Sequence, residues 1–386
     1  MDNEATSLFL INNHNNDRGP PFEMLSNIFS YLASDGPLQL RHILFVARSW
    51  HDAAVYSPNL WTTILIDREF YSRFRDDTLT HGEAFIRCCF IRSRGLPIII
   101  NVQYQDRGIG LTHTNEAFSS TVIGRLLGTI EHCHTKRCKA LTWTCGDPDM
   151  DSYALYKIFP SQLDMLEYLC LQDFVPFGLM ELDIPSVLHF PRCPNLKEVS
   201  LKNHCEIGLP IFFRNEDLER VEKLTFVNTS TWRPFDLLCI SRYHNIDTLT
   251  LQDKGGSMTD DQIYEYQIAA GDNLAHLPRL KALITIGCIP NCILESIGAP
   301  GLMSLRLETD EDAHHTLATI PTTLLTTLHS IDISLKPLPT SSWVPLLHQV
   351  VGEAPCLSHL FIAGWMKDGL EAEDWYRQLN VTIHCV

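Results

Sequence analysis

The chain has 386 residues, of which 45% are hydrophobic and 20% are charged, and its formal net charge is −16. This is the composition of a folded globular protein and not that of a disordered chain, which is more polar and more highly charged. The negative charge, with no basic stripe along the sequence, argues against nucleic acid and anionic membrane surfaces as partners, so we expect neither.

Residues 1–18 are polar and rich in Asn and Asp, and we expect them to be disordered. They lack a basic region, and the apolar run from Leu8 to Ile11 is too short for the core of a signal peptide. No later stretch reaches the ~18 apolar residues that span a bilayer. The 13 cysteines are scattered and lie mostly in or beside apolar runs, as buried reduced thiols do. We therefore expect a soluble protein of the cytoplasm, the nucleus or both.

Residues 19–67 predict a small unit of three helices. Pro20 and Pro21 favour a helix start, and the residues Asp35 to Pro37 end that helix. A second helix would carry Leu38, Leu40, Ile43, Leu44 and Val46, and a third would run from about residue 48 to 56. A unit this small cannot bury all its apolar side chains internally, so some must face the rest of the chain or another protein.

The same segment resembles an F-box, the motif that docks on the Skp-type adaptor of cullin ubiquitin ligases. Its matching residues are Pro21, Glu23, Met24, Leu25, Ile28, Phe29, Leu32, Leu40, Leu44, Val46, Arg48 and Trp50, followed by the flank SPNLWTTI at residues 57–64 that is common in fungal F-box proteins. Two positions depart from the pattern: Pro20 replaces a leading Leu, and Ala47 replaces a Cys.

The resemblance covers about 50 residues and implies adaptor binding through this unit. The residues that we expect to bind the adaptor or to form the core behind that surface are Pro21, Leu25, Ile28, Phe29, Leu32, Leu40, Leu44, Val46, Trp50 and Trp61.

After a linker or first helical return at residues 68–95, a short strand of the form L-x-x-L-x-L recurs. An early strand is expected at residues 96–102. Nine more are centred on Trp143, Leu171, Leu201, Phe226, Leu251, Thr285, Leu307, Ile333 and Ile362. Their centres lie 22–34 residues apart, a range that overlaps the ~20–29-residue period of leucine-rich repeats. The alternative is an unrelated α/β fold.

We therefore predict an α/β protein in which the three-helix F-box segment precedes a leucine-rich-repeat-like solenoid with a curved parallel sheet over residues 96–386. Single repeats cannot bury their apolar face, whereas stacked repeats can. A helix is expected from Asn115 to Cys133, and residues 368–380, with Trp375 and Tyr376, should form part of a C-terminal cap. The arrangement resembles fungal F-box proteins whose C-terminal halves are diverged leucine-rich repeats.

Motifs for nucleotide binding, zinc-dependent hydrolysis and serine hydrolysis are missing from the sequence. The best metal candidate is His132, Cys133, His134 and Cys138 with Cys145 nearby, but a strand would point alternate members apart. We expect no catalytic residue, no cofactor and no metal.

These features favour a non-catalytic substrate receptor of a Skp–cullin–F-box ubiquitin ligase, which would hold the adaptor, and through it a cullin, at one end and a target protein on its repeats. An F-box scaffold acting outside ligases is one alternative. A solenoid enzyme or ligand-binding protein with an accidental F-box match is another.

The residue between the two inward positions of each strand should point to the concave face. That row comprises Thr142, Cys170, Ser200, Thr225, Thr250, Ile284, Arg306, Asp332 and Phe361. Interfaces tend to centre on aromatic residues and Arg, so we expect the target site near Arg306 and Phe361, with Trp365 at its rim.

Overall fold

The computed structural model describes residues 20–33, 36–74, 79–104, 128–130, 135–145, 162–172, 191–202, 215–228, 232, 240–254, 263–264, 275–287, 289–309, 317, 320–335, 340–371 and 373–385. The segment expected to be disordered, residues 1–18, and most of the helix expected from Asn115 to Cys133 lie outside these residues.

The centre of the structure is one twelve-stranded sheet in which every neighbouring pair of strands is parallel. Its strands are β1 (Thr63–Ile66), β2 (Ile98–Tyr104), β3 (Cys138–Cys145), β4 (Tyr168–Gln172), β5 (Glu198–Lys202), β6 (Lys223–Asn228), β7 (Thr248–Asp253), β9 (Ala282–Ile286), β11 (Ser304–Thr309), β12 (Ser330–Leu335), β13 (His359–Ile362) and β14 (Thr382–Cys385). The short strands β8 (Ala275–His276) and β10 (Ile297–Gly298) pair separately. Because the strands follow one another in chain order, the chain advances by one strand per turn, as in a solenoid.

The nine strand centres expected from the sequence form one continuous row across the sheet, from Trp143 on β3 to Ile362 on β13. All nine side chains are at most 2% exposed. The residues two positions earlier, such as Leu169, Leu249 and Leu360, form a second buried row. These two rows are the core of the solenoid, and each turn covers the apolar face of its neighbour.

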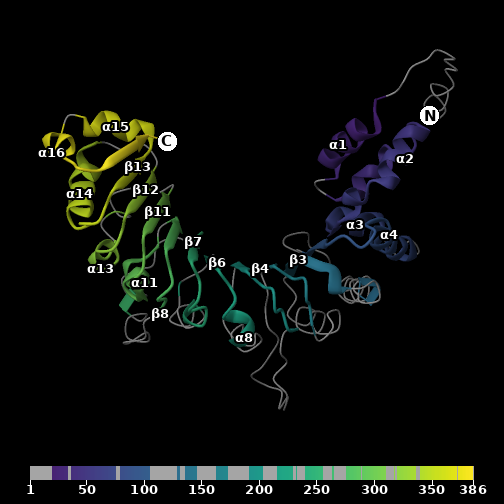
Figure 1. Cartoon of the computed structure of the whole chain (residues 1–386), viewed down its shortest axis with the longest axis horizontal. Coiled ribbons are helices and arrows are strands. Elements are labelled where there is room, and N and C mark those ends of the chain that lie inside the picture. The colour runs from purple at the N-terminus through teal and green to yellow at the C-terminus, as the bar shows by residue number, and fades with distance from the viewer. Residues whose placement is uncertain are drawn as a thin grey trace, which may run out of the picture.

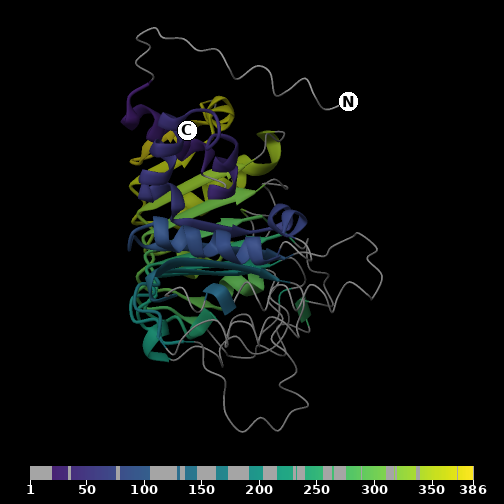
Figure 2. The same cartoon turned by 90° about the vertical axis from the view of Figure 1, so that its right-hand side faces the viewer.

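The sheet bends into an arc whose inner side carries the strands (Figure 1). The helices α8 (Asn215–Leu218), α11 (Asn291–Glu295), α13 (Thr322–Leu325) and α14 (Thr340–Gly352) lie on the outer side. In the view turned by 90°, the strands of the sheet lie side by side (Figure 2). A strand on the concave side and a short helical or irregular return on the convex side make a leucine-rich-repeat-like solenoid, as predicted.

The N-terminal unit consists of α1 (Phe22–Leu32), the 3₁₀ helix η1 (Pro37–His42), α2 (Arg48–Tyr56) and the 3₁₀ helix η2 (Pro58–Trp61). The second helix is therefore a short 3₁₀ helix, and not the longer helix expected to carry residues 38–46. The backbone hydrogen bonds of a 3₁₀ helix join residues three apart. For example, the Ile43 N–H donates to the Leu40 carbonyl at 3.0 Å. This spacing turns Leu40 and Ile43 inward and leaves Phe45 and Val46 exposed.

The sheet begins at residue 63, earlier than the expected residue 96. Ile64 and Ile66 of β1 are buried, and β1 pairs with β2 over Thr63 to Ile66. Within residues 68–95 the structure describes α3 (Arg68–Arg73) and α4 (Leu79–Arg92), so the described part of the first return is mainly helical. The Arg92 guanidinium lies 4.3 Å from the centre of the Trp61 ring, which ties α4 to the N-terminal unit.

The C-terminal end is covered by α15 (Gly364–Leu370), α16 (Asp374–Arg377) and β14. The Trp375 ring stacks on His348 of α14, with ring centres 4.5 Å apart, and Tyr376 packs against the core. The last strand, β14, was not expected. It extends the sheet by one parallel strand beyond β13.

Candidate functional site

The residues expected to bind an adaptor divide into two sets. Leu25, Phe29, Leu40 and Trp61 are buried, and Leu44 and Trp50 are half-buried against them. The Phe29 and Trp50 rings lie 5.4 Å apart, and the Trp61 indole N–H donates to the Ala54 carbonyl (2.8 Å). These six residues are therefore the core of the N-terminal unit.

The other four, Pro21, Ile28, Leu32 and Val46, are exposed. They have apolar neighbours that the sequence prediction did not include among the binding residues. We define the N-terminal apolar surface as Met24, Ile28, Tyr31 and Leu32 of α1 with Phe45 and Val46 of the following turn. Tyr31 is 82% exposed and Phe45 is 88% exposed.

Exposed apolar side chains are concentrated in this unit. In the described part of the chain, thirteen large hydrophobic residues are exposed, and seven of them lie between Phe22 and Val46. The remaining six are dispersed over the other residues, as single surface hydrophobics commonly are. A concentration of this kind is typical of an interaction surface.

Helical periodicity could have identified the missed residues. Met24 and Tyr31 lie four residues before and three residues after Ile28, so all three share one face of α1. Leu25 and Phe29 lie on the adjoining face, which is buried. The helix is therefore apolar over more of its circumference than its own unit can cover.

The concave row predicted from the sequence is aligned in register from Thr142 to Phe361, and it continues to His384 on β14. It is not uniformly accessible. Cys170 and Ser200 are buried, and the Tyr168 side chain hydrogen-bonds to both. Burial also raises the pKa of the Tyr168 hydroxyl, so it remains a neutral donor. Of the other residues in the row, Arg306 near the C-terminal end is exposed and the remaining six are half-buried.

At that end Arg306, Asp332, Phe361 and His384 occupy four neighbouring strands. Arg306 Nη2 lies 3.4 Å from Glu308 Oε2, and its Nε lies 3.6 Å from Asp332 Oδ2. The Phe361 ring stacks on His384 at 4.4 Å, and His384 Nε2 lies 3.3 Å from His359 Nδ1. We call Arg306, Asp332, His359, Phe361 and His384 the C-terminal concave surface.

Trp365 does not belong to this surface. It is half-buried in α15, and its ring meets the Trp343 ring of α14 edge-on at 5.6 Å. Its position within the helical layer gives it a packing role at the C-terminal end.

Among the described residues, no three His, Cys, Asp or Glu side chains come together as metal ligands. His132, Cys133 and His134 lie outside those residues. Cys138 is buried, which raises its pKa to about 12 and keeps the thiol protonated. Within the same residues, no helix is both long enough and apolar enough to cross a membrane.

Comparisons with known proteins give a limited result. No protein-family model matches the sequence, and no curated protein matches it. Among solved structures, the chain is similar to the crystal structure of the leucine-rich repeat-containing protein LegL7 from Legionella pneumophila. The two share 10% sequence identity with a TM-score of 0.37, over 76% of this chain and 90% of that one.

Proposed function

We propose that this chain is a non-catalytic receptor that docks on a Skp-type adaptor through its N-terminal unit and holds a target protein on its solenoid. In the ligase form of this proposal, the adaptor connects the chain to a cullin. The reaction rate then depends on the effective concentration of the target near the ubiquitin-conjugating enzyme, and no side chain of this protein reacts.

The observation that carries the proposal is the N-terminal apolar surface. Its residues lie in the segment that resembles an F-box, and a folded core of Leu25, Phe29, Leu40 and Trp61 supports them from behind. Exposed apolar side chains on a rigid helix can bury their area against a partner at little cost in conformational entropy. The adaptor is the partner that the resemblance implies.

The test measures binding of the full chain to a purified Skp-type adaptor. An Ile28→Asp, Val46→Asp variant places two carboxylates on the N-terminal apolar surface. Anchors of this kind often contribute ~2 kcal/mol each, so we expect affinity to fall by at least about a hundredfold. Since Ile28 and Val46 are 47% and 45% exposed, the variant should fold normally.

The matched control is Ile91→Asp with Met303→Asp, which adds the same charge at exposed apolar positions elsewhere. It should bind the adaptor like the unmodified chain. Leu25 is unsuitable as a probe, because at 1% exposure an Asp there would disrupt the core. Adaptor binding by the Ile28, Val46 variant at unchanged affinity would refute the proposal. Recovery of a cullin with the chain from cells distinguishes a ligase subunit from a scaffold.

A further inference from the structure

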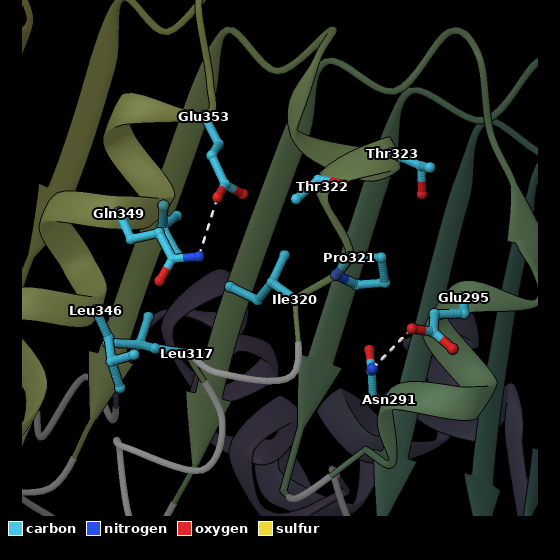
Figure 3. A pocket seen from close by; sticks show the side chains of 11 residues that line it. Asn291, Glu295, Leu317, Ile320, Pro321, Thr322, Thr323, Leu346, Gln349 and Glu353 are labelled. Carbon is cyan, nitrogen blue, oxygen red and sulfur yellow. Dashed lines mark hydrogen bonds between the residues drawn. The ribbon is translucent and has the colours of Figure 1, made fainter.

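A groove on the convex side of the solenoid lies between α11, α13 and α14 (Figure 3). It encloses roughly 520 Å³. Its floor is aliphatic and is formed by Leu317, Ile320, Pro321, Leu346 and Val350. The groove is separate from the N-terminal apolar surface and from the C-terminal concave surface, neither of which shares a residue with it.

Each wall of the groove carries a carboxylate held by an amide one helical turn away. Asn291 Nδ2 donates to Glu295 Oε1 at 2.8 Å on α11. Gln349 Nε2 donates to Glu353 Oε1 at 2.9 Å beside α14. The two pairs lie on opposite sides of Ile320 and Pro321, as Figure 3 shows. Both hydrogen bonds are solvent-exposed, so the two carboxylates remain accessible to a ligand.

The lining lacks the cations that would balance these carboxylates. None of the eleven residues that line the groove is Lys or Arg. Among the described residues, neither Glu295 nor Glu353 has a basic side chain within ion-pair distance. The Asn291 Oδ1 atom is also buried, and no donor within the described part of the chain bonds to it. The groove therefore offers an aliphatic floor and two carboxylates.

We propose that this groove binds a basic peptide segment of a partner protein. A bulky aliphatic side chain of the peptide lies on the floor, and Lys or Arg residues on either side of it bind Glu295 and Glu353. The chain's net charge of −16 favours the approach of such a segment. The site does not depend on adaptor docking, and under the proposed function it would be a target-recognition site.

The probe is a fluorescein-labelled seven-residue peptide with a central leucine and a lysine two positions to either side, in a background of serine and alanine. Its anisotropy is followed during titration with the full chain at 50 mM and 300 mM NaCl. We expect saturable binding that weakens at the higher salt. Glu295→Gln with Glu353→Gln should weaken binding at least tenfold, and Leu346→Ser should weaken it severalfold.

Matched controls distinguish binding in the groove from nonspecific attraction of the peptide to the negatively charged chain. Glu219→Gln with Asp368→Asn removes the same charge from exposed positions outside the groove and should leave binding unchanged. A second peptide with glutamates in place of the lysines, and a third with serine in place of the leucine, should both bind at least tenfold more weakly.

Three results would overturn the inference: no saturable binding of the lysine peptide, equal binding by the Glu295, Glu353 variant, or equal binding of the serine peptide. Displacement of the probe by spermidine with no dependence on the leucine would assign the groove to a small polyamine and would also overturn it. No adaptor is present in this experiment, so its failure leaves the proposed function untouched.

Discussion

Gly287 follows β9 with a φ of 84°, a left-handed conformation that residues with a Cβ rarely adopt. A Cβ at this position would lie 2.3 Å from the Asp253 carbonyl oxygen on the neighbouring turn. We expect Gly287→Ala to lower the free energy of unfolding by ~1–3 kcal/mol or more, because conformational strain and steric overlap add. The midpoint of urea unfolding measures this loss.

The control for Gly287 is Gly352→Ala at the end of α14, where no atom lies within 4 Å of the added Cβ. This change should be neutral or slightly stabilising. Equal unfolding midpoints for the two variants would show that the close approach of Gly287 to Asp253 does not constrain the fold.

The cysteines give a second prediction at the residue scale. Burial raises the pKa of Cys138 to about 12, whereas Cys356 and Cys385 are exposed. Since the thiolate is the reactive form, iodoacetamide at pH 8 should label Cys356 and Cys385 and leave Cys138 unmodified. Peptide mass spectrometry after timed quenching checks this, and early labelling of Cys138 in the folded chain would contradict its burial.

At the scale of elements, the C-terminal helices should act as a cap. Truncation after Ala363 removes α15, α16 and β14, and with them the buried side chains of Met366 and Leu370. Trp343, now 0% exposed, would lose its contact with Trp365. An uncapped solenoid end exposes apolar surface, so we expect aggregation or a markedly lower melting temperature, measured by light scattering and thermal unfolding.

Truncation after Asn380 serves as the milder comparison, because it removes β14 and keeps α15 and α16. It should lower the melting temperature less than truncation after Ala363. A monomeric, equally stable chain ending at Ala363 would show that these elements do not cap the array.

The sequence predicted the strands well because two positions, two residues apart, are buried in strand after strand of the solenoid. Trp143, Leu251 and Ile333 mark strands that each bury two side chains per turn, and that signal survives divergence. β1 and β14 were missed for different reasons. The four residues of β1 lie within a flank assigned to the helical unit, and β14 contains no fully buried residue.

The N-terminal apolar surface was less predictable than the strands. Periodicity placed Leu25, Ile28, Phe29 and Leu32 on one apolar face, but packing against α2, η1 and η2 decides which part of that face is covered. Leu25 and Phe29 became core, and Ile28 and Leu32 remained exposed. The groove between α11 and α14 could not be predicted either, since residues almost sixty positions apart form its walls.

At the scale of the whole molecule, the arc predicts an extended particle in solution. A compact globule of this length would have a radius of gyration of ~21 Å. Small-angle scattering should give a clearly larger value, because the chain forms a single curved layer of strands with returns on its outer side. A value at the globular scaling would be incompatible with the arc.

The arc also brings a geometric constraint to the proposed function. β1 pairs directly with β2, so the N-terminal unit is continuous with the sheet that carries the C-terminal concave surface. A target bound at the C-terminal concave surface, or in the groove between α11, α13 and α14, would be held at a fixed orientation relative to the adaptor. We expect insertion of a flexible glycine-serine segment after Thr62, between η2 and β1, to preserve adaptor affinity and to reduce ubiquitin transfer to a bound target.

The central claim, adaptor docking by the N-terminal unit, is tested most directly by hydrogen exchange of the full chain with and without a purified Skp-type adaptor. The N-terminal apolar surface predicts that the adaptor slows exchange in residues 22–32 and 43–47, and leaves the strands from β3 to β13 unchanged. Protection confined to the solenoid strands, or no protection at adaptor concentrations that saturate an F-box protein of known function, would contradict the account.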